Sequence, residues 1–160
     1  LIRLARSYMP DLVITSNVIV GFPGETEEEF AETVRYLEEI DLYEMHVFKF
    51  SPRKGTPAAK MAGQLTEAVK AARSDVLMEM SERHSQAYRA SFAGETMAIL
   101  VEETLQIEGR DYYVGFTENY IRVAVPADKY ALTVNALTEV TLTGTPVGAE
   151  CVLGKPCFSA

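Results

Sequence analysis

The stretch "VIVGFPGETEEEF" (Val18 to Phe30) joins an apolar run to an acidic segment through two glycines and a proline. The apolar run starts upstream as "DLVITSNVIV" (11–20), and its β-branched residues are typical of a parallel strand covered on both faces. After the turn, we expect Thr26 to be a helix N-cap, and Glu29 would complete a capping box. The stretch therefore predicts a strand, a tight turn and a helix, the junction at which α/β proteins bind ligands.

The segments that follow extend this pattern. Phe30, Val34 and Leu37 recur at helical spacing and predict a helix of about four turns. "EMHVFKF" (Glu44–Phe50) alternates and predicts a second strand. Strand, helix and strand in this order make a βαβ unit with neighbouring parallel strands. The proline- and glycine-rich segment 51–64, "SPRKGTPAAKMAGQ", is then a loop at the carboxyl end of the second strand.

The rest of the chain changes character near residue 92. Residues 66–92 predict one long helix, with a stripe made of Leu65, Val69, Ala72, Val76, Met80, Arg83 and Ala87. Five short runs with β character follow: "TMAILVEE", "DYYVGFT", "NYIRVAV", "ALTEVTLTG" and "GAECVLG", with turns expected at 108–110, 117–119 and 144–146. We therefore predict an α/β domain over residues 1–92 and an all-β domain, a small OB-like five-stranded barrel, over residues 93–160.

Charge and hydropathy exclude some classes of protein. The net charge of the 160 residues is −8. Residues 1–90 carry 11 Lys and Arg against 14 Asp and Glu, and residues 91–160 carry 4 against 9, so the chain is not a general polyanion binder. No apolar run approaches the roughly 18 residues of a membrane span. The first residues also lack the apolar core of a signal peptide, so we expect a cytoplasmic protein without a membrane partner.

The cysteines and histidines give no sign of a metal or catalytic centre. Cys151 and Cys157 form no CxxC pair, which argues against a zinc site or a disulfide framework and for two free thiols in a reducing compartment. His46 and His84 are expected to be a strand residue and a solvent-facing helix residue rather than acid–base catalysts. The sequence therefore predicts no catalytic residue and no metal ligand within this chain.

The glycine-containing turn predicts the kind of ligand it would accept. Gly21 and Gly24 remove Cβ atoms where a flat ligand must approach the main chain, and Pro23 stiffens the turn. Glu25 and the run 27–29 crowd the helix N-terminus, so the turn is not a phosphate cradle of the Walker or GxGxxG kind. A neutral or cationic ligand suits it better, and the alternative is a structural turn with a capped helix.

The loop after the second strand carries cations. Arg53, Lys54 and Lys60 surround a rigid Gly-Thr-Pro at the carboxyl end of the second strand. A cationic rim in this position is suited to phosphate groups. A solvated basic loop without a ligand is the alternative.

Three motifs together resemble a known family. In this order, "VIVGFPGETEEEF", "HVFKFSPRKGTPAAKM" and "GFTENYIRVAV" resemble the C-terminal half of radical S-adenosylmethionine (radical SAM) methylthiotransferases. The loop is most similar to the tRNA-modifying branch, and within it to enzymes that methylthiolate N6-threonylcarbamoyladenosine at tRNA position 37. A methylthiotransferase acting on an aspartate of a ribosomal protein, or a non-catalytic RNA-binding module, are the alternatives.

The resemblance implies how S-adenosylmethionine would be held. Residues 11–50 would be the last strands of an incomplete (β/α)6 barrel. The adenosyl group would lie against Ile19, Val20, Gly21, Phe22, Pro23, Gly24 and Glu25, flanked by Phe48 and Phe50 largely through their main chain. Asn17 departs from the family, which often has Asp there.

The resemblance also implies an RNA partner. Residues 93–157 look like a TRAM domain, a β-barrel that grips the tRNA anticodon arm. The residues expected to contact RNA are Arg53, Lys54, Lys60, Tyr120 and Arg122. Because the barrel segment has an excess of carboxylates, its cations would have to share one face and its aromatic side chains would have to stack on bases.

The iron–sulfur chemistry of the family would reside elsewhere. Its CxxxCxxC motif lies upstream of the segment that this chain resembles, so the two 4Fe–4S clusters of a full-length enzyme would take ligands outside this chain. Cys151 and Cys157 match neither cluster. We therefore expect the chain alone to be inactive. A sheet of two strands would also leave its edges and one apolar face open, which predicts self-association through residues 11–50.

Overall fold

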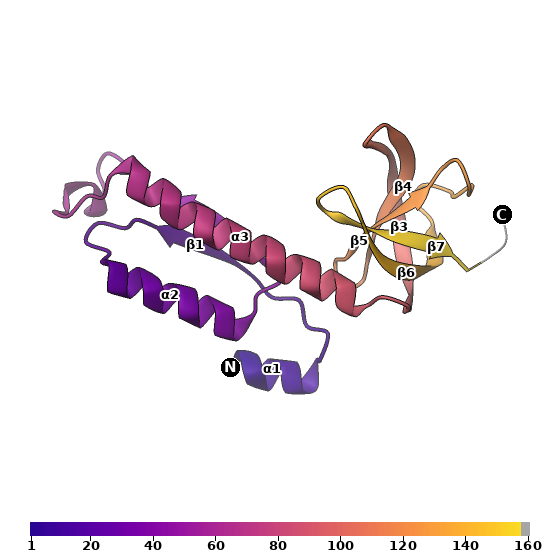
Figure 1. Cartoon of the computed structure of the whole chain (residues 1–160), viewed down its shortest axis with the longest axis horizontal. Helices are drawn as coiled ribbons and strands as arrows, with labels where there is room; N and C mark the ends of the chain where they lie inside the picture. The colour runs from indigo at the N-terminus through magenta and orange to yellow at the C-terminus, as the bar shows by residue number, and fades with distance from the viewer. Residues whose placement is uncertain (158–160) are drawn as a thin grey trace. The chain divides into compact units, whose positions relative to one another are not determined.

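The computed structural model describes residues 1–157, and the chain divides into two compact units, Leu1–Gln86 and Ala87–Ala160. The first unit contains α1 (Ile2–Tyr8), β1 (Thr15–Val20), α2 (Glu27–Ile40), β2 (Glu44–Lys49), a 3-10 turn at Ala58–Lys60 and most of α3 (Glu67–Ser91) (Figure 1). The second contains β3 (Thr96–Ile107), β4 (Arg110–Thr117), β5 (Arg122–Pro126), β6 (Leu137–Val147) and β7 (Cys151–Pro156).

The predicted βαβ unit is confirmed. β1 and β2 are parallel neighbours, with Ile19 opposite Phe48 in their register. The capping box at the start of α2 is present as well: the Glu29 N–H donates to Thr26 Oγ1 at 3.1 Å, and the Thr26 N–H donates to Glu29 Oε2 at 2.8 Å. The short helix α1 was not expected from the sequence.

Only one face of this sheet is covered by the described chain. On that face α2 and α3, side by side in Figure 1, pack with the strands around a core of Val20, Phe30, Leu37, Leu42, Met45, Leu77 and Met80. On the other face Ile19 and Phe48 are 56% and 54% exposed. Within residues 1–157 the first strand is therefore covered on one face, which agrees with the expectation that a sheet of two strands leaves one apolar face open.

The two edges of the sheet also differ. On the outer side of β2, the main-chain N–H of Met45 donates to Ser81 Oγ of α3 at 2.9 Å, and this bond is buried. The outer edge of β1 pairs with no strand in the part of the chain that the structure describes. The β2 edge is thus partly satisfied by a helix, whereas the β1 edge is open.

The buried side of α3 differs from the predicted stripe. Val76, expected in the stripe, is 44% exposed. The residues that α3 buries are Lys70, Arg73, Ser74, Leu77, Met80, Ser81, His84 and Ser85. Of the predicted stripe only Met80 is among these residues, and hydropathy missed the others because most of their side chains are polar.

His84 is another correction. Its side chain is 5% exposed, with Nε2 3.5 Å from Glu38 and Nδ1 3.5 Å from Asp41, so it does not face solvent as expected. His46 on β2 is exposed. The position of His84 between α2 and α3 makes it a packing residue.

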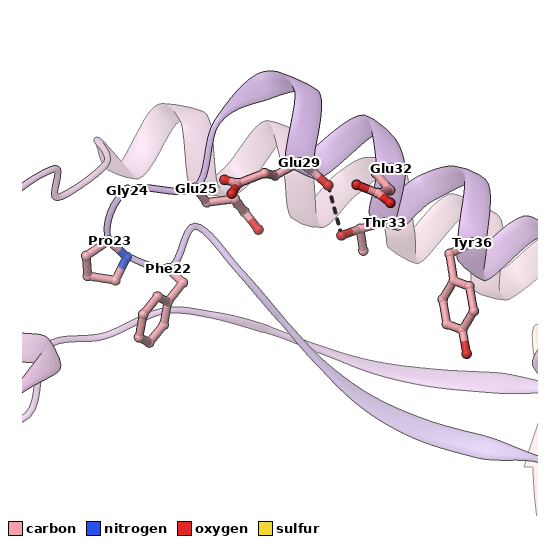
Figure 2. A pocket seen from close by; sticks show the side chains of 8 residues that line it. All are labelled: Phe22, Pro23, Gly24, Glu25, Glu29, Glu32, Thr33 and Tyr36. Atoms are coloured by element: carbon pink, nitrogen blue, oxygen red, sulfur yellow. Dashed lines mark hydrogen bonds between the residues drawn. The ribbon is translucent and has the colours of Figure 1, made fainter.

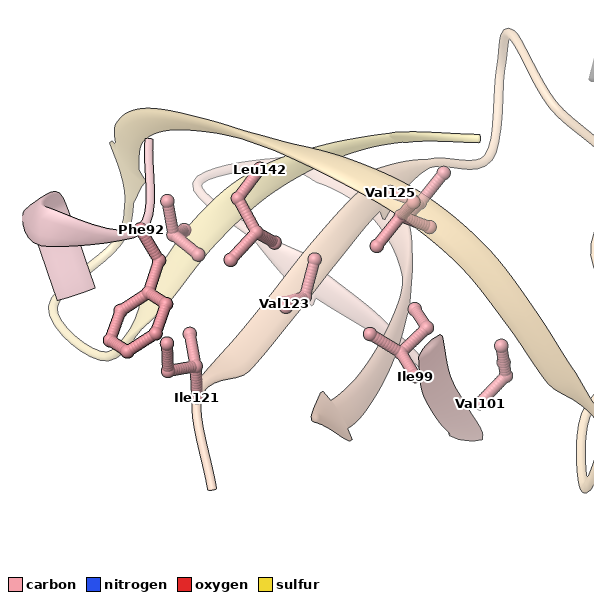
Figure 3. Close-up of a cluster of buried hydrophobic side chains, with 9 residues drawn as sticks. Phe92, Ile99, Val101, Ile121, Val123, Val125 and Leu142 are labelled. Carbon is pink, nitrogen blue, oxygen red and sulfur yellow. The ribbon is translucent and has the colours of Figure 1, made fainter. Parts of the chain in front are cut away.

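The second unit is a closed five-stranded barrel in the order β3–β4–β5–β7–β6, as expected from the sequence. Figure 3 shows its core, which consists of Phe92, Ile99, Val101, Ile121, Val123, Val125, Val140, Leu142 and Val152. The turn expected at 144–146 is wrong: these residues lie inside β6, where the pairing with β7 becomes irregular between Leu142 and Pro146.

Two further expectations concern membranes and cysteines. None of the helices within residues 1–157 has the length and apolar character that crossing a membrane requires. Cys151 and Cys157 are both free thiols, as expected. Cys151 is buried, and burial raises the pKa of its thiol, as is common for cysteines in a protein core.

Candidate functional site

The turn between β1 and α2 lies next to the end of β2. The Phe50 N–H donates to the Val20 carbonyl at 2.8 Å, which places the ends of the two strands together. The Gly24 N–H donates to the Gly63 carbonyl at 2.9 Å, so the loop that follows β2 returns to contact the turn. Both loops at the carboxyl ends of the parallel strands therefore meet at one place, where α/β folds bind ligands.

The two glycines of the turn have different surroundings. Both have left-handed main-chain conformations, with φ of 73° at Gly21 and 87° at Gly24. A Cβ at Gly21 would collide with Cγ of Lys70 and lie 3.2 Å from its Cδ. A Cβ at Gly24 would meet no atom within 4 Å. Gly21 thus admits a lysine stem from α3, whereas Gly24 leaves open space.

Gly24 borders an open pocket of about 620 Å3. Figure 2 shows the residues that line it: Phe22, Pro23, Gly24 and Glu25 from the turn, and Glu29, Glu32, Thr33 and Tyr36 from α2. The volume falls within the range of about 300–1,000 Å3 typical of small-molecule sites. Two aromatic rings and three glutamates line this pocket, and the negative charge of the carboxylates disfavours an anionic ligand.

The nine residues expected around an adenosyl group divide by exposure. Ile19, Phe22, Gly24 and Phe48 are exposed, Glu25 and Phe50 are half-buried, and Val20, Gly21 and Pro23 are buried. The rings of Phe22 and Phe50 meet edge-on with centroids 5.2 Å apart, which links the pocket to the end of β2. The structure therefore leaves six of these residues accessible to a ligand, and of the three buried ones Pro23 borders the pocket.

Two buried cations of α3 support the turn, and the sequence did not single them out. Lys70 and Arg73 are 3% and 4% exposed. Arg73 forms ion pairs with Glu25 and Glu27. Burial by itself lowers the pKa of Arg73, but the hydrogen bonds to Glu27 and Glu25 outweigh it and the pKa is raised. Nothing local in the sequence indicates this role, because the partners of Arg73 lie 46 and 48 residues away.

The basic loop is uncompensated by nearby carboxylates. Arg53, Lys54 and Lys60 are exposed. The sequence has no acidic residue from Met45 to Thr66. None of these three cations forms an ion pair within the described residues, so the loop presents positive charge on a chain that is acidic overall.

The cations of the barrel are arranged differently. The Arg122 guanidinium donates to Glu150 at 2.6 Å and to Glu103 at 3.2 Å, and it lies 5.8 Å from the centroid of the Phe116 ring. Arg110 donates to Asp128 at 2.7 Å. Tyr120, in contrast, is 69% exposed at the β4–β5 turn, with its ring centroid 6.4 Å from that of Phe116. The aromatic pair is therefore the accessible part of this expected RNA contact.

No group of three or more His, Cys, Asp or Glu side chains within residues 1–157 is arranged to hold a metal ion.

Sequence comparisons identify relatives of known activity. The chain is 44% identical over 119 residues to the threonylcarbamoyladenosine tRNA methylthiotransferase of Bacillus subtilis, covering 74% of this chain and 26% of that protein. It is 45% identical over 103 residues to the tRNA-2-methylthio-N(6)-dimethylallyladenosine synthase of Thermobifida fusca, and the match covers 64% of this chain and 21% of that protein. The enzyme of the same name from Thermus thermophilus is 36% identical over 155 residues, covering 93% and 33%.

These relatives confirm the resemblance drawn from the three motifs. The chain spans between 21% and 33% of the length of the three. No protein-family model matches it. The relatives include both threonylcarbamoyladenosine and dimethylallyladenosine enzymes.

Proposed function

We propose, from the homology of this chain to the tRNA methylthiotransferases, that it is the C-terminal segment of a cytoplasmic radical SAM enzyme that methylthiolates C2 of N6-threonylcarbamoyladenosine at tRNA position 37. In this proposal residues 1–92 complete a radical SAM partial barrel and residues 93–160 form a TRAM domain. The observation that carries it is the 44% identity to the Bacillus subtilis enzyme across most of the chain.

The geometry of the turn supports S-adenosylmethionine as the ligand. When bound, S-adenosylmethionine would supply the radical chemistry and the methyl group. The open main chain at Gly24 and the apolar side chains of Ile19, Phe22 and Phe48 suit a flat, uncharged adenine. Glu29 and Glu32 line the pocket beside Phe22 and Gly24, and they suit the sulfonium and amino charges of this cofactor better than they suit a phosphate.

The exposed cations support a tRNA partner. Arg53, Lys54 and Lys60 would contact backbone phosphates, because no carboxylate neutralises them. In the barrel, Tyr120 would stack on an unpaired base. A phosphate contact to Arg122 would compete with Glu103 and Glu150, so Arg122 would contribute less to tRNA affinity than Tyr120.

Methylthiolation of N6-dimethylallyladenosine is a second candidate. The 45% identity to the Thermobifida fusca enzyme and the 93% coverage by the Thermus thermophilus enzyme favour it. The two reactions differ in the N6 substituent of the target adenosine, which none of the residues named above is expected to read.

Nucleoside mass spectrometry distinguishes these candidates. A complete gene containing this segment is expressed in two strains. The first lacks the methylthio group on threonylcarbamoyladenosine, and the second lacks it on dimethylallyladenosine. We expect the methylthio group to return on threonylcarbamoyladenosine and not on dimethylallyladenosine. Return on the latter alone supports the second candidate, and return on neither contradicts both.

A separate binding test addresses the RNA contacts. In the complete enzyme, replacing Tyr120 and Arg122 together by alanine is expected to weaken tRNA binding by about tenfold or more, the value of one lost stacking contact and one lost phosphate contact. Unchanged tRNA affinity would mean that this face of the barrel does not contact RNA. The matched control is Arg110→Ala, whose guanidinium is also paired with a carboxylate but which is not among the proposed contacts.

A further inference from the structure

The first turns of α3 bury two charged side chains against the turn that follows β1. Lys70 and Arg73 are among the most buried side chains of the first unit. Charged side chains are rarely buried to this extent unless they are paired. Their partners therefore indicate why α3 carries them.

Arg73 is bonded to three acceptors near the turn. Its Nη1 donates to the Glu25 carboxylate and, at 3.2 Å, to the Glu25 carbonyl. Its Nη2 donates to Glu27 Oε1 at 2.6 Å. The guanidinium also lies over the Phe30 ring, 5.1 Å from the centroid. Arg73 thus holds both the side chain and the main chain of Glu25.

Glu25 passes this constraint to Gly21. The same carboxylate oxygen, Oε2, accepts the Gly21 N–H at 2.8 Å. The Glu25 side chain is 15% exposed, so this hydrogen bond is shielded from water. Lys70 closes the other side of Gly21, since its stem occupies the space that a Cβ would take. The main chain of the turn is therefore fixed from α3, about 50 residues downstream.

We infer that Arg73 is a positioning residue, which through Glu25 holds the Gly21–Gly24 main chain in the conformation that accepts the adenosyl group. This inference rests on the proposed function for its ligand. A turn that is already ordered loses less conformational entropy on binding, so its ligand binds more tightly. An isolated glycine- and proline-containing turn would not have that order.

The test uses two readouts and a matched control. The first readout is amide hydrogen exchange of Gly21 in this chain, compared with that of Met45. The Met45 N–H is buried against Ser81, so its exchange reports opening of the whole unit. The second readout is the dissociation constant of S-adenosylmethionine for the cluster-loaded complete enzyme. The control is Arg83→Gln, which breaks the hydrogen bonds of another α3 arginine, those to Glu38 of α2, away from the turn.

We expect Arg73→Gln to raise Gly21 exchange about tenfold relative to Met45 and to weaken S-adenosylmethionine binding about tenfold. Glu25→Gln should act in the same direction, and the effects should be less than additive in the double variant, because Arg73 and Glu25 share a hydrogen bond. Arg83→Gln should change neither ratio. If Arg73→Gln does not fold, Arg73→Lys replaces it as the test variant. Lysine keeps the charge but cannot bridge Glu25 and Glu27 with a planar guanidinium.

The outcomes separate this inference from the proposed function. If Gly21 and Met45 exchange rise equally, or Gly21 exchange is unchanged, Arg73 only stabilises the unit and the inference is wrong. If Gly21 exchange rises but cofactor affinity is unchanged, Arg73 orders the turn without positioning a ligand, and the inference is also wrong. If the unmodified enzyme binds no S-adenosylmethionine, the proposed function fails, whereas the exchange result still decides whether Arg73 orders the turn.

Discussion

Replacing each glycine of the turn by alanine tests the asymmetry between them. Gly21 and Gly24 both have positive φ, so alanine at either position should cost about 1–2 kcal/mol of main-chain strain. Only at Gly21 does the new methyl group meet another atom, the stem of Lys70. Overpacking of this kind adds about 1–3 kcal/mol. We therefore expect Gly24→Ala to lower the free energy of unfolding of the first unit by about 1–2 kcal/mol and Gly21→Ala by about 2–5 kcal/mol.

Urea titration of this chain, followed by amide NMR signals of β1 and β2, measures the first unit separately from the barrel. The double variant Gly21→Ala with Lys70→Ala should lose the steric part of the effect, which a double-mutant cycle reports as a coupling free energy of about 1–3 kcal/mol. Equal effects of Gly21→Ala and Gly24→Ala, within about 0.5 kcal/mol, would refute the reasoning. So would the absence of coupling to Lys70.

Three other predictions concern packing, pH and RNA. Leu77→Ala should lower the free energy of unfolding by about 2–5 kcal/mol, since Leu77 is fully buried, whereas Val76→Ala on the exposed side should change it by at most about 0.5 kcal/mol; urea denaturation checks both. The hydrogen bond from Arg110 lowers the pKa of Asp128. The stabilisation by the ionised Asp128 is therefore present at neutral pH and is lost as the pH falls below the ordinary value of 3.8. Asp128→Asn should destabilise the barrel at pH 7 and have no effect once Asp128 is protonated. Thermal unfolding across pH checks this, and a stability difference between the two proteins that does not change with pH would contradict it. Arg53→Glu should weaken tRNA binding by the complete enzyme and reduce its salt dependence, with S-adenosylmethionine affinity unchanged; the opposite ranking in titrations would assign the loop to the cofactor instead.

The parts of the fold that local chemistry specifies were predictable. Thr26 and Glu29 form a capping box with a fixed three-residue spacing, so the start of α2 could be placed from the sequence. The barrel strands are short runs with β character bounded by turn residues, which made their number predictable. The prediction of a turn at 144–146 was wrong because Gly144 and Pro146 lie at an irregularity within β6 rather than at its end.

The parts that depend on long-range pairing were not predictable. Hydropathy places Arg73 and Ser81 in solvent, but Arg73 is neutralised by Glu25 and Glu27, and Ser81 accepts the main-chain N–H of Met45. All three partners lie at least 36 residues away in the sequence. Similarly, nothing local distinguishes Gly21 from Gly24, since the difference is made by Lys70.

The unequal borders of the small sheet limit how copies of this segment can assemble. Because Ser81 of α3 packs against the β2 edge and the β1 edge pairs with no described strand, we expect further strands to pair with the β1 edge. We expect two isolated copies joined there to leave no second site for a third, so association should stop at pairs instead of propagating into fibres.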